Sequence, residues 1–322
     1  MAYTVKELTK FVNDNIYLTE CQKKEFLNIK MNIFYVDQKS NSQIITYIDN
    51  SNESKSFGRM IRLYMLFNHF LDFDFTEKLM FSIRKNRYPD DKIYKYILKH
   101  PENHKKKHND KNVCSLYVYI FENIALKIYL KHLPKENANN IKYLDIACGN
   151  GFKTKLFGEK LELRKENVFG TDIEEWGPYV KEKKNMPINF KLMKDNILDF
   201  PDNEFDIISI FLSLHHINDQ DMQIILNEIK RVITENGVLV IIEHNVLNDY
   251  DHLIVDIEHS MNSYIYEKRA DESYSRYFNW IELDLVMDKH GFYWVAGNQL
   301  TGYVGFDVRY DNPYYTIYKL KK

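Results

Sequence analysis

The sequence YLDIACGNGF, residues 143–152, decides the fold of this chain. Its apolar segment, Tyr143–Ala147, predicts a buried strand, and Gly149 and Gly151 follow that strand directly. Glycines at such a place let the backbone turn sharply and approach a ligand, while the next helix presents its amide groups. Because parallel sheets bind ligands at the carboxyl ends of their strands, we expect functional residues at this junction.

Around this junction, predicted strands alternate with predicted helices. We expect strands over Tyr143–Ala147, Val168–Asp172, Asn189–Leu192, Phe205–Leu212, Val238–Glu243 and Pro313–Leu320, and helices over Lys153–Leu161, Tyr179–Lys184 and Asp221–Val232. Short apolar strands separated by helices predict an α/β fold with a doubly wound, mostly parallel sheet covered on both faces.

The N-terminal part of the chain has a different character. Apolar residues at helical spacing predict helices over Val5–Phe11, Glu20–Met31, Arg59–Leu71, Glu77–Lys85, Lys92–Lys99 and Leu116–Leu133. Only Gly58 precedes residue 149 among the 11 glycines, and the polar run 100–112 lacks periodicity. We therefore predict a helical accessory or substrate-docking region over residues 1–112, with a linker at 100–112, and a second domain over 113–322.

Composition excludes several classes of protein. The 322 residues are 44% hydrophobic and 28% charged, which excludes wholesale disorder. No stretch approaches the ~20 apolar residues of a membrane span, and the N-terminus has no apolar signal-peptide region. Cys21, Cys114 and Cys148 form no CxxC pair, so neither a disulfide framework nor a cysteine zinc site is indicated. We expect a cytoplasmic, reducing location and no membrane partner.

An acidic residue at the end of the next predicted strand indicates the kind of ligand. Asp172 ends the next predicted strand in VFGTDIEEW, 21 residues beyond Gly151, where a carboxylate can accept both hydroxyls of a ribose. The glycine turn lacks the third glycine of the dinucleotide pattern, because Thr154 stands there, and it lacks the GK[ST] ending of a phosphate loop. Nucleotide phosphate is therefore a poor fit.

These residues resemble the class I S-adenosylmethionine-dependent methyltransferases of the LHH-bearing type, which have a Rossmann-like fold. LDIACGNG is similar to that family's first motif and TDIEE to its second acidic strand end. LMKDNILDFPDNEFDIISIFLSLHHI and IKRVITENGVLVIIEHN resemble the motifs that follow, in the family's order. The resemblance covers roughly residues 115–320 and implies S-adenosyl-L-methionine as cofactor, S-adenosyl-L-homocysteine as product, and no metal.

The resemblance also implies roles for individual residues. The glycines would pass under the methionine moiety, Asp145 would anchor the loop or the amino group, and Asp172 would hold the ribose. The pair at 195–196 would flank the adenine, and residues 211–214 would wall the sulfonium. The implied cofactor residues are Asp145, Ala147, Gly149, Asn150, Gly151, Asp172, Ile173, Asp195, Asn196, Phe211 and Ser213. Ala147 departs from the family pattern, in which glycine is common.

The motifs that are missing from the sequence exclude several classes of methyl acceptor. The fourth strand ends in FLSLHH and not in the [DN]PP[YF] turn of exocyclic-amine methyltransferases, and no cysteine nucleophile stands near it. Ser213 occupies the region where ribose methyltransferases carry an aspartate. The candidate catalytic residues are His215, His216, Glu243 and His244, either as proton acceptors or as residues that shape the pocket. A metal set of His252, Asp256 and His259 has suitable residue types, but we expect no metal.

Three functions stay open. Residues 1–135 carry 23 Lys and Arg against 15 Asp and Glu (+8), and the remainder 21 against 31 (−10). The basic part narrowly favours RNA, including an mRNA cap, as the acceptor. The alternatives are a small-molecule methyltransferase that uses the helical part as a lid, and a catalytically silent subunit with the same fold. The Asn- and Lys-rich composition is typical of an AT-rich genome, such as that of a parasite or a large virus.

Overall fold

The structure, a computed structural model, divides the chain into two compact units. It describes residues 66–68, 70–76, 78–79, 95–105, 111–133, 140–174, 188–247, 249–262, 265, 276–299 and 313–321. The first unit comprises Met1–His108, Leu247–Glu272 and Thr301–Asp311; the second comprises Asn109–Val246, Ser273–Leu300 and Asn312–Lys322. Two segments from the C-terminal half of the chain thus join the first unit, which a single boundary at 112/113 does not anticipate.

The second unit is built on one seven-stranded sheet in the order β3-β2-β1-β4-β5-β7-β6. The strands are β1 (Tyr143–Ile146), β2 (Val168–Asp172), β3 (Asn189–Leu192), β4 (Phe205–Phe211), β5 (Ile233–His244), β6 (Phe292–Gln299) and β7 (Pro313–Leu320). Strands β1 to β5 pair in parallel, while β7 is antiparallel to both β5 and β6. The predicted α/β class with a mostly parallel sheet is confirmed.

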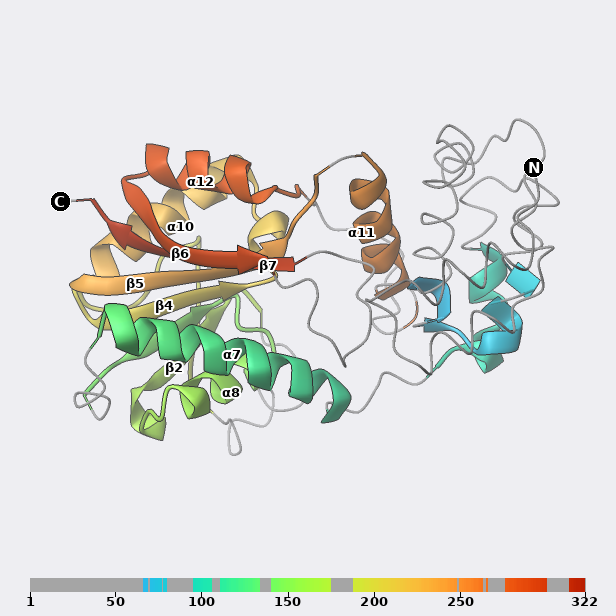
Figure 1. Cartoon of the computed structure of the whole chain (residues 1–322), viewed down its shortest axis with the longest axis horizontal. Coiled ribbons are helices and arrows are strands. Elements are labelled where there is room, and N and C mark those ends of the chain that lie inside the picture. The colour runs from blue at the N-terminus through green and yellow to red at the C-terminus, as the bar shows by residue number, and fades with distance from the viewer. Residues whose placement is uncertain are drawn as a thin grey trace. The chain divides into compact units, whose positions relative to one another are not determined.

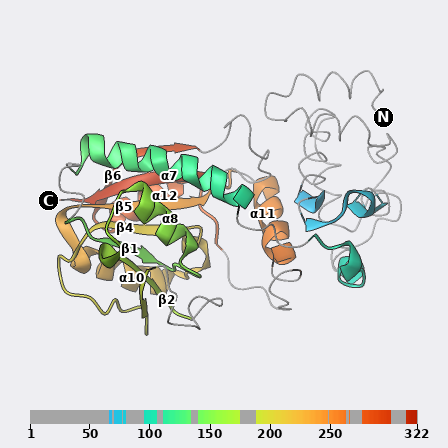
Figure 2. The same cartoon turned by 90° about the horizontal axis from the view of Figure 1, so that it is seen from below.

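Helices cover both faces of this sheet (Figures 1 and 2). On one face lie α7 (Lys111–Lys131) and α8 (Phe152–Lys160), and on the other α10 (Asp219–Val232) and α12 (Trp280–Lys289). Two short 3-10 helices, η4 (Lys165–Asn167) and η5 (Leu214–His216), lie in the connections. The fold is therefore doubly wound, as the alternation of strands and helices predicts.

The face under α10 and α12 forms an apolar core of this unit. Every third or fourth residue of α10 is buried against the sheet: Met222, Ile225, Leu226, Ile229 and Val232. The side chain of Asn218 caps α10 by accepting the backbone N–H groups of Gln220 and Asp221. This cap explains why the helix begins at Asp219, two residues before the predicted start.

The opposite face packs through aromatic rings. Phe121 of α7 lies 4.9 Å from Phe157 of α8 and 5.0 Å from Phe211 of β4, measured between ring centroids. Gly158 lets α8 approach β2 closely, because a Cβ atom there would lie 2.8 Å from a methyl carbon of Val168. The close contact holds α8 firmly over the strand ends that carry the candidate site.

Several elements differ from their predicted bounds. The helix α7 begins at Lys111, inside the run predicted as a linker, and β5 begins at Ile233, five residues before the predicted Val238. The sequence reasoning predicted neither α12 nor β6. The predicted helices Val5–Phe11, Glu20–Met31 and Tyr179–Lys184 lie outside the described residues.

The described part of the first unit is helical at residues 66–68, 70, 73–76, 78–79 and 95–98, within or next to predicted helices. It also contains η2 (Pro101–Asn103) and α11 (Asp249–Met261). Residues 100–105 are less irregular than predicted, because η2 lies there and His104 forms a β-bridge with Leu71. Across the described residues of both units, no helix combines the length and apolar character needed to cross a membrane.

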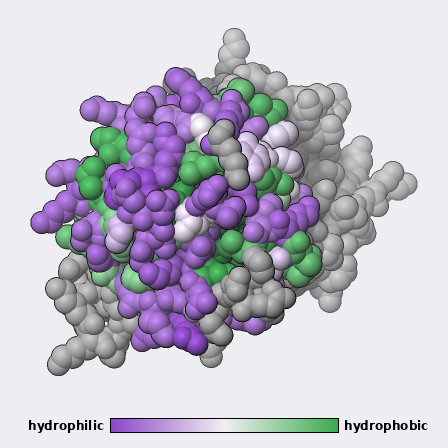
Figure 3. Space-filling view, turned by 90° about the vertical axis from the view of Figure 1, so that its left-hand side faces the viewer, coloured by the Kyte–Doolittle hydropathy of each residue, from purple (hydrophilic) through white to green (hydrophobic). Residues whose placement is uncertain are grey.

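One face of the surface is shown in Figure 3. Its coloured part is mainly hydrophilic, with hydrophobic residues in small groups between hydrophilic ones. Such scattered apolar residues are normal on a water-exposed protein surface.

Candidate functional site

The strand order reverses between β1 and β4, and two loops meet there. The loop after β1 spans residues 147–151, and the segment after β4 spans residues 212–216. The hydroxyl of Ser213 donates hydrogen bonds to the carbonyl oxygens of Phe211 at 3.2 Å and Ala147 at 3.5 Å. Ligands of open α/β sheets bind at this kind of switch point, so both loops lie where the sequence predicted a site.

The loop after β1 has the conformation of a close backbone turn. Ala147, Gly149 and Gly151 all have positive φ angles, of 56°, 56° and 73°. A Cβ atom added to Gly149 would meet nothing within 4 Å, so open space lies in front of this backbone. The left-handed conformation of Ala147 explains why glycine is common there in the family that the sequence resembles. Beside it, Asn150 accepts the backbone N–H of Phe152 at 3.1 Å, at the start of α8.

Asp172, at the end of β2, forms a hydrogen bond with this turn. Its carboxylate accepts the backbone N–H of Gly149 at 2.8 Å and the more distant N–H of Glu174 at 3.4 Å, and the residue is 5% exposed. The next residue, Ile173, is 59% exposed and offers an apolar surface beside the carboxylate. The structure thus brings together the glycine turn and the acidic strand end, which lie 21 residues apart in the sequence.

Asp145 lies inside the unit and anchors the loop. One carboxylate oxygen accepts the hydroxyl of Ser209 and the other that of Thr154, each at 2.5 Å. Burial raises the pKa of Asp145 to about 7, although these two hydrogen bonds act in the opposite direction. Because both oxygens are engaged within the protein, the contacts favour the first of the two implied roles, loop anchor, over a contact with a ligand amino group.

The other residues that the resemblance assigns to the cofactor site lie in different surroundings. Asp195 and Asn196 form a tight turn with φ angles of 51° and 60°, closed by the N–H of Ile197 bonding to the carbonyl of Lys194 at 2.9 Å. This turn follows β3, the strand next to β2, and its role beside the adenine stays a prediction. Phe211 is 3% exposed and belongs to the aromatic core, so its ring holds the end of β4 in place.

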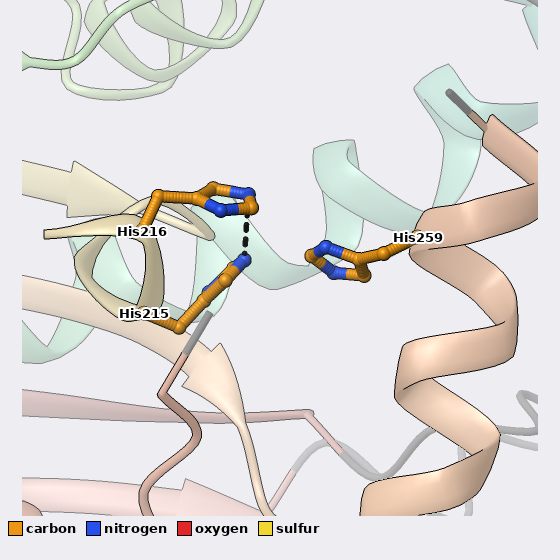
Figure 4. A group of neighbouring side chains, drawn as sticks. All are labelled: His215, His216 and His259. Atoms are coloured by element: carbon orange, nitrogen blue, oxygen red, sulfur yellow. Dashed lines mark hydrogen bonds between the residues drawn. The ribbon is translucent and has the colours of Figure 1, made fainter. Parts of the chain in front are cut away.

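The four candidate catalytic residues lie together at the ends of β4 and β5. Nδ1 of His215 lies 2.7 Å from a carboxylate oxygen of Glu243, and each of the two side chains is 1% exposed. Nε2 of His215 lies 3.0 Å from Nε2 of His216, which is exposed (Figure 4). The ring of His244 lies 5.0 Å from that of His215 between centroids.

Glu243 is held as a buried carboxylate. Its Oε1 accepts the backbone N–H of Leu214 at 2.7 Å and that of His215 at 3.4 Å, while Oε2 accepts the N–H of His244 at 3.2 Å. Burial by itself would raise the pKa of Glu243, but the charge of His215 and these hydrogen bonds together hold it below its usual value. The carboxylate therefore stays ionised at neutral pH.

The residues considered as a metal set share one helix of the first unit. His252 and Asp256 of α11 form an ion pair at 2.9 Å, one helical turn apart. His259, also drawn in Figure 4, follows on the same helix. An ion pair of this kind is a common feature of exposed helix surfaces.

Sequence reasoning missed three residues of the second unit. Ser209 and Thr154 hold Asp145, and Tyr277 lies 5.6 Å from the ring of His215 and 6.1 Å from that of His244. Alternation along β4 puts Ser209 on the face of Phe211, but both faces of this strand are buried, so the pattern did not single out Ser209. Tyr277 lies outside any motif, so its sequence context gave no signal.

The fold and the glycine turn agree with what comparison finds. Residues 144–241 match a family model described as a methyltransferase domain. The matched segment runs from β1 into β5 of the seven-stranded sheet, and the match confirms the predicted resemblance to a methyltransferase domain over these residues.

Individual relatives match smaller parts of the chain. Rat mitochondrial arginine-hydroxylase NDUFAF5 is 35% identical over 100 residues, which are 30% of this chain and 27% of that protein. The demethylmenaquinone methyltransferase of Staphylococcus carnosus is 29% identical over 164 residues, 49% of this chain and 63% of the relative. A solved loganic acid methyltransferase with SAH covers 68% of this chain and 98% of its own at 12% identity, with a TM-score of 0.46. The chain thus spans less than two thirds of these two curated relatives.

Proposed function

We propose that this protein transfers a methyl group from S-adenosyl-L-methionine to a small-molecule acceptor. The observation that carries the proposal is the hydrogen bond from the backbone N–H of Gly149 to the carboxylate of Asp172. Open space lies in front of the turn at Gly149. This arrangement lies in the segment that matches a methyltransferase domain.

The residues present fit the cofactor. The uncrowded backbone at Gly149 leaves room for the methionine moiety, and Asp172 provides a carboxylate for ribose hydroxyls at the end of β2. The exposed side chain of Ile173 and the turn at Asp195 and Asn196 would border the adenine. When bound, the cofactor supplies an electrophilic methyl group; the protein's part is to hold the acceptor in line with it and to exclude water.

A small molecule fits better than RNA. The match with demethylmenaquinone methyltransferases supports a small acceptor of the quinone type, because that acceptor is part of their name. Residues 136–322, which contain the candidate site, carry a net charge of −10, and this charge would repel a phosphate backbone. The basic residues 1–135, which alone favour RNA, lie mostly outside the second unit. A catalytically silent subunit is disfavoured by the intact glycine turn and Asp172.

The test measures binding and turnover separately. Calorimetry with S-adenosyl-L-methionine and S-adenosyl-L-homocysteine should give saturable binding to the full chain. Radiolabelled cofactor is then offered with reduced demethylmenaquinone, a small-molecule extract, total RNA or capped transcripts. Label in the quinol or the extract supports the proposal; label in RNA alone would restore the RNA interpretation. Cofactor binding without turnover on any acceptor would favour the silent subunit, and no cofactor binding would remove the proposal.

A further inference from the structure

The loop after β3, residues 193–204, carries the turn at Asp195 and Asn196 and passes along α10 before β4 begins. We propose that Arg231, near the end of α10, is a positioning residue for cofactor binding. It fixes the backbone of this loop, and with it the turn that would border the adenine. This inference rests on the proposed function, because the turn matters for binding only if the protein takes an adenine-containing cofactor.

The guanidinium of Arg231 forms hydrogen bonds through all three of its nitrogens. Nη2 donates to the carbonyl oxygen of Leu198 and Nη1 to that of Phe200, each at 2.7 Å. Nη1 also donates to the carboxylate of Asp202 at 2.8 Å, and Nε and Nη2 donate to that of Glu228 at 3.0 and 2.7 Å. A planar guanidinium can serve several acceptors at once, which the single ammonium of a lysine cannot do in the same geometry. Because two of the acceptors are backbone carbonyls, these bonds fix the path of the chain itself.

Glu228, one helical turn before Arg231, holds the same loop. Its Oε2 accepts the backbone N–H of Leu198 at 2.9 Å, while Arg231 binds the carbonyl of that residue. Both backbone polar groups of Leu198 are therefore bonded to α10, and the residue is 1% exposed. The hydrogen bonds from Arg231 hold the pKa of Glu228 below its usual value, so both partners stay charged at neutral pH.

The turn lies between two residues whose backbones are held. Before it, the backbone N–H of Met193 donates to the carbonyl oxygen of Asp172 at 2.8 Å, which ties the loop to the residue that would hold the ribose. After it, Leu198 is tied to α10. Between them, Asp195 and Asn196 have φ angles of 51° and 60°. Residues other than glycine keep this left-handed conformation only where the surrounding structure holds them in it.

Apolar packing already attaches this loop to the rest of the unit. Met193, Leu198 and Phe200 belong to the apolar core under α10. The hydrogen bonds of Arg231 add direction, because they are satisfied at only one position of the two carbonyl oxygens. A displacement of about 1 Å at a binding residue can cost about 100-fold in function. Arg231 can therefore affect recognition of the base without touching the cofactor.

Calorimetry of the full chain with two ligands tests the proposal. S-inosyl-L-homocysteine differs from S-adenosyl-L-homocysteine only at the base, where a carbonyl oxygen replaces the amino group, so the ratio of the two Kd values reports contacts at the base. Because a carboxylate such as Asp195 accepts an N–H and not a carbonyl, wild-type protein should bind the inosyl compound at least about tenfold more weakly. In Arg231→Ala, the Kd for S-adenosyl-L-homocysteine should rise about tenfold and the ratio should fall toward 1. A wild-type ratio near 1, or an unchanged ratio in Arg231→Ala, would overturn the proposal.

Lys142→Ala is the matched control. Lys142 pairs with Glu204 at 2.6 Å, and its side chain is 39% exposed, beside 32% for Arg231. It precedes β1, at the opposite end of that strand from the glycine turn, so Lys142→Ala should keep the wild-type ratio. Arg231→Lys keeps the charge but has a single nitrogen, so its ratio should lie between those of wild type and Arg231→Ala. It replaces Arg231→Ala if that variant does not fold, and a wild-type ratio in Arg231→Lys would also overturn the proposal.

Amide hydrogen exchange provides a second test that needs no ligand. The N–H of Ile197 closes the turn by bonding to the carbonyl of Lys194, and the N–H of Leu198 bonds to Glu228. In Arg231→Ala, both amides should exchange at least about tenfold faster than in wild type, while the amides of β1 keep their rates. Unchanged exchange at Ile197 and Leu198 would overturn the positioning role even in a protein that binds the cofactor. If wild-type protein binds neither ligand, the proposed function fails, and hydrogen exchange still decides whether Arg231 holds the loop.

Discussion

A methyl group added at Gly149 should separate the stability of the fold from its ability to bind the cofactor. Gly149 has a φ angle of +56°, and its N–H is held by Asp172 at 2.8 Å. A Cβ atom would meet nothing within 4 Å of the protein, so Gly149→Ala creates no clash in the folded chain. It does place a methyl group in the space where the proposed cofactor would pass.

The stability change follows from the backbone alone. A left-handed conformation costs an alanine about 1–2 kcal/mol, and loss of glycine's freedom in the unfolded chain returns about 0.4–1 kcal/mol. The net destabilisation of Gly149→Ala is about 1 kcal/mol, or a fall in Tm of about 2–4 °C for a domain of this size. The Kd for S-adenosyl-L-methionine should rise at least about tenfold, equivalent to about 1.4 kcal/mol.

The chain offers a matched control. Gly291, in the turn between α12 and β6, also has a positive φ angle, of +83°, and its Cβ would also meet nothing within 4 Å. Gly291→Ala should therefore lose similar stability and keep full cofactor affinity. Both variants are compared by thermal unfolding and isothermal calorimetry. A Gly149→Ala protein that binds S-adenosyl-L-methionine as tightly as Gly291→Ala would refute the assignment of the open space to the cofactor.

Three further substitutions test neighbouring residues. Asp172→Ala removes the proposed ribose acceptor and the brace on the turn, so calorimetry should show at least a 100-fold weaker affinity (about 2.7 kcal/mol) with an unchanged circular dichroism spectrum. Burial raises the pKa of Asp145 to about 7, so the folded protein keeps a proton that the unfolded chain loses near pH 4. Stability should therefore fall by up to about 4 kcal/mol as pH rises from about 4 to 7, and the urea midpoint of Asp145→Asn should lack this decline; parallel pH curves for both proteins would contradict it. Ala147→Gly relieves a φ angle of +56° and should raise the free energy of unfolding by about 1 kcal/mol, measured by urea denaturation; a lower value would contradict the strain.

The sequence predicted the elements whose side chains follow one simple pattern. The strands β1 to β4 are apolar or bounded by clear turns, and they were placed to within one residue. The helix α12 was missed although Asn279 and Glu282 form a capping box before it, which is a signal in the sequence. The strand β6 is an edge strand with exposed Tyr293 and Trp294, so its pattern is not that of a buried strand.

The sequence by itself determined the class of fold, the glycine turn and the acidic residue that ends the second strand, because short-range patterns and fixed spacing encode these features. Only the tertiary structure decided what the polar residues do. Asp145 lies in the first predicted strand and Asp172 ends the second, so the sequence gives them similar positions. In the structure Asp145 is buried between two hydroxyl groups, whereas Asp172 accepts the backbone N–H of Gly149. In the same way, Glu243 and His215 are 28 residues apart and meet only because β4 and β5 are neighbours in the sheet. Contacts between distant segments depend on strand order and register, and no local pattern specifies these.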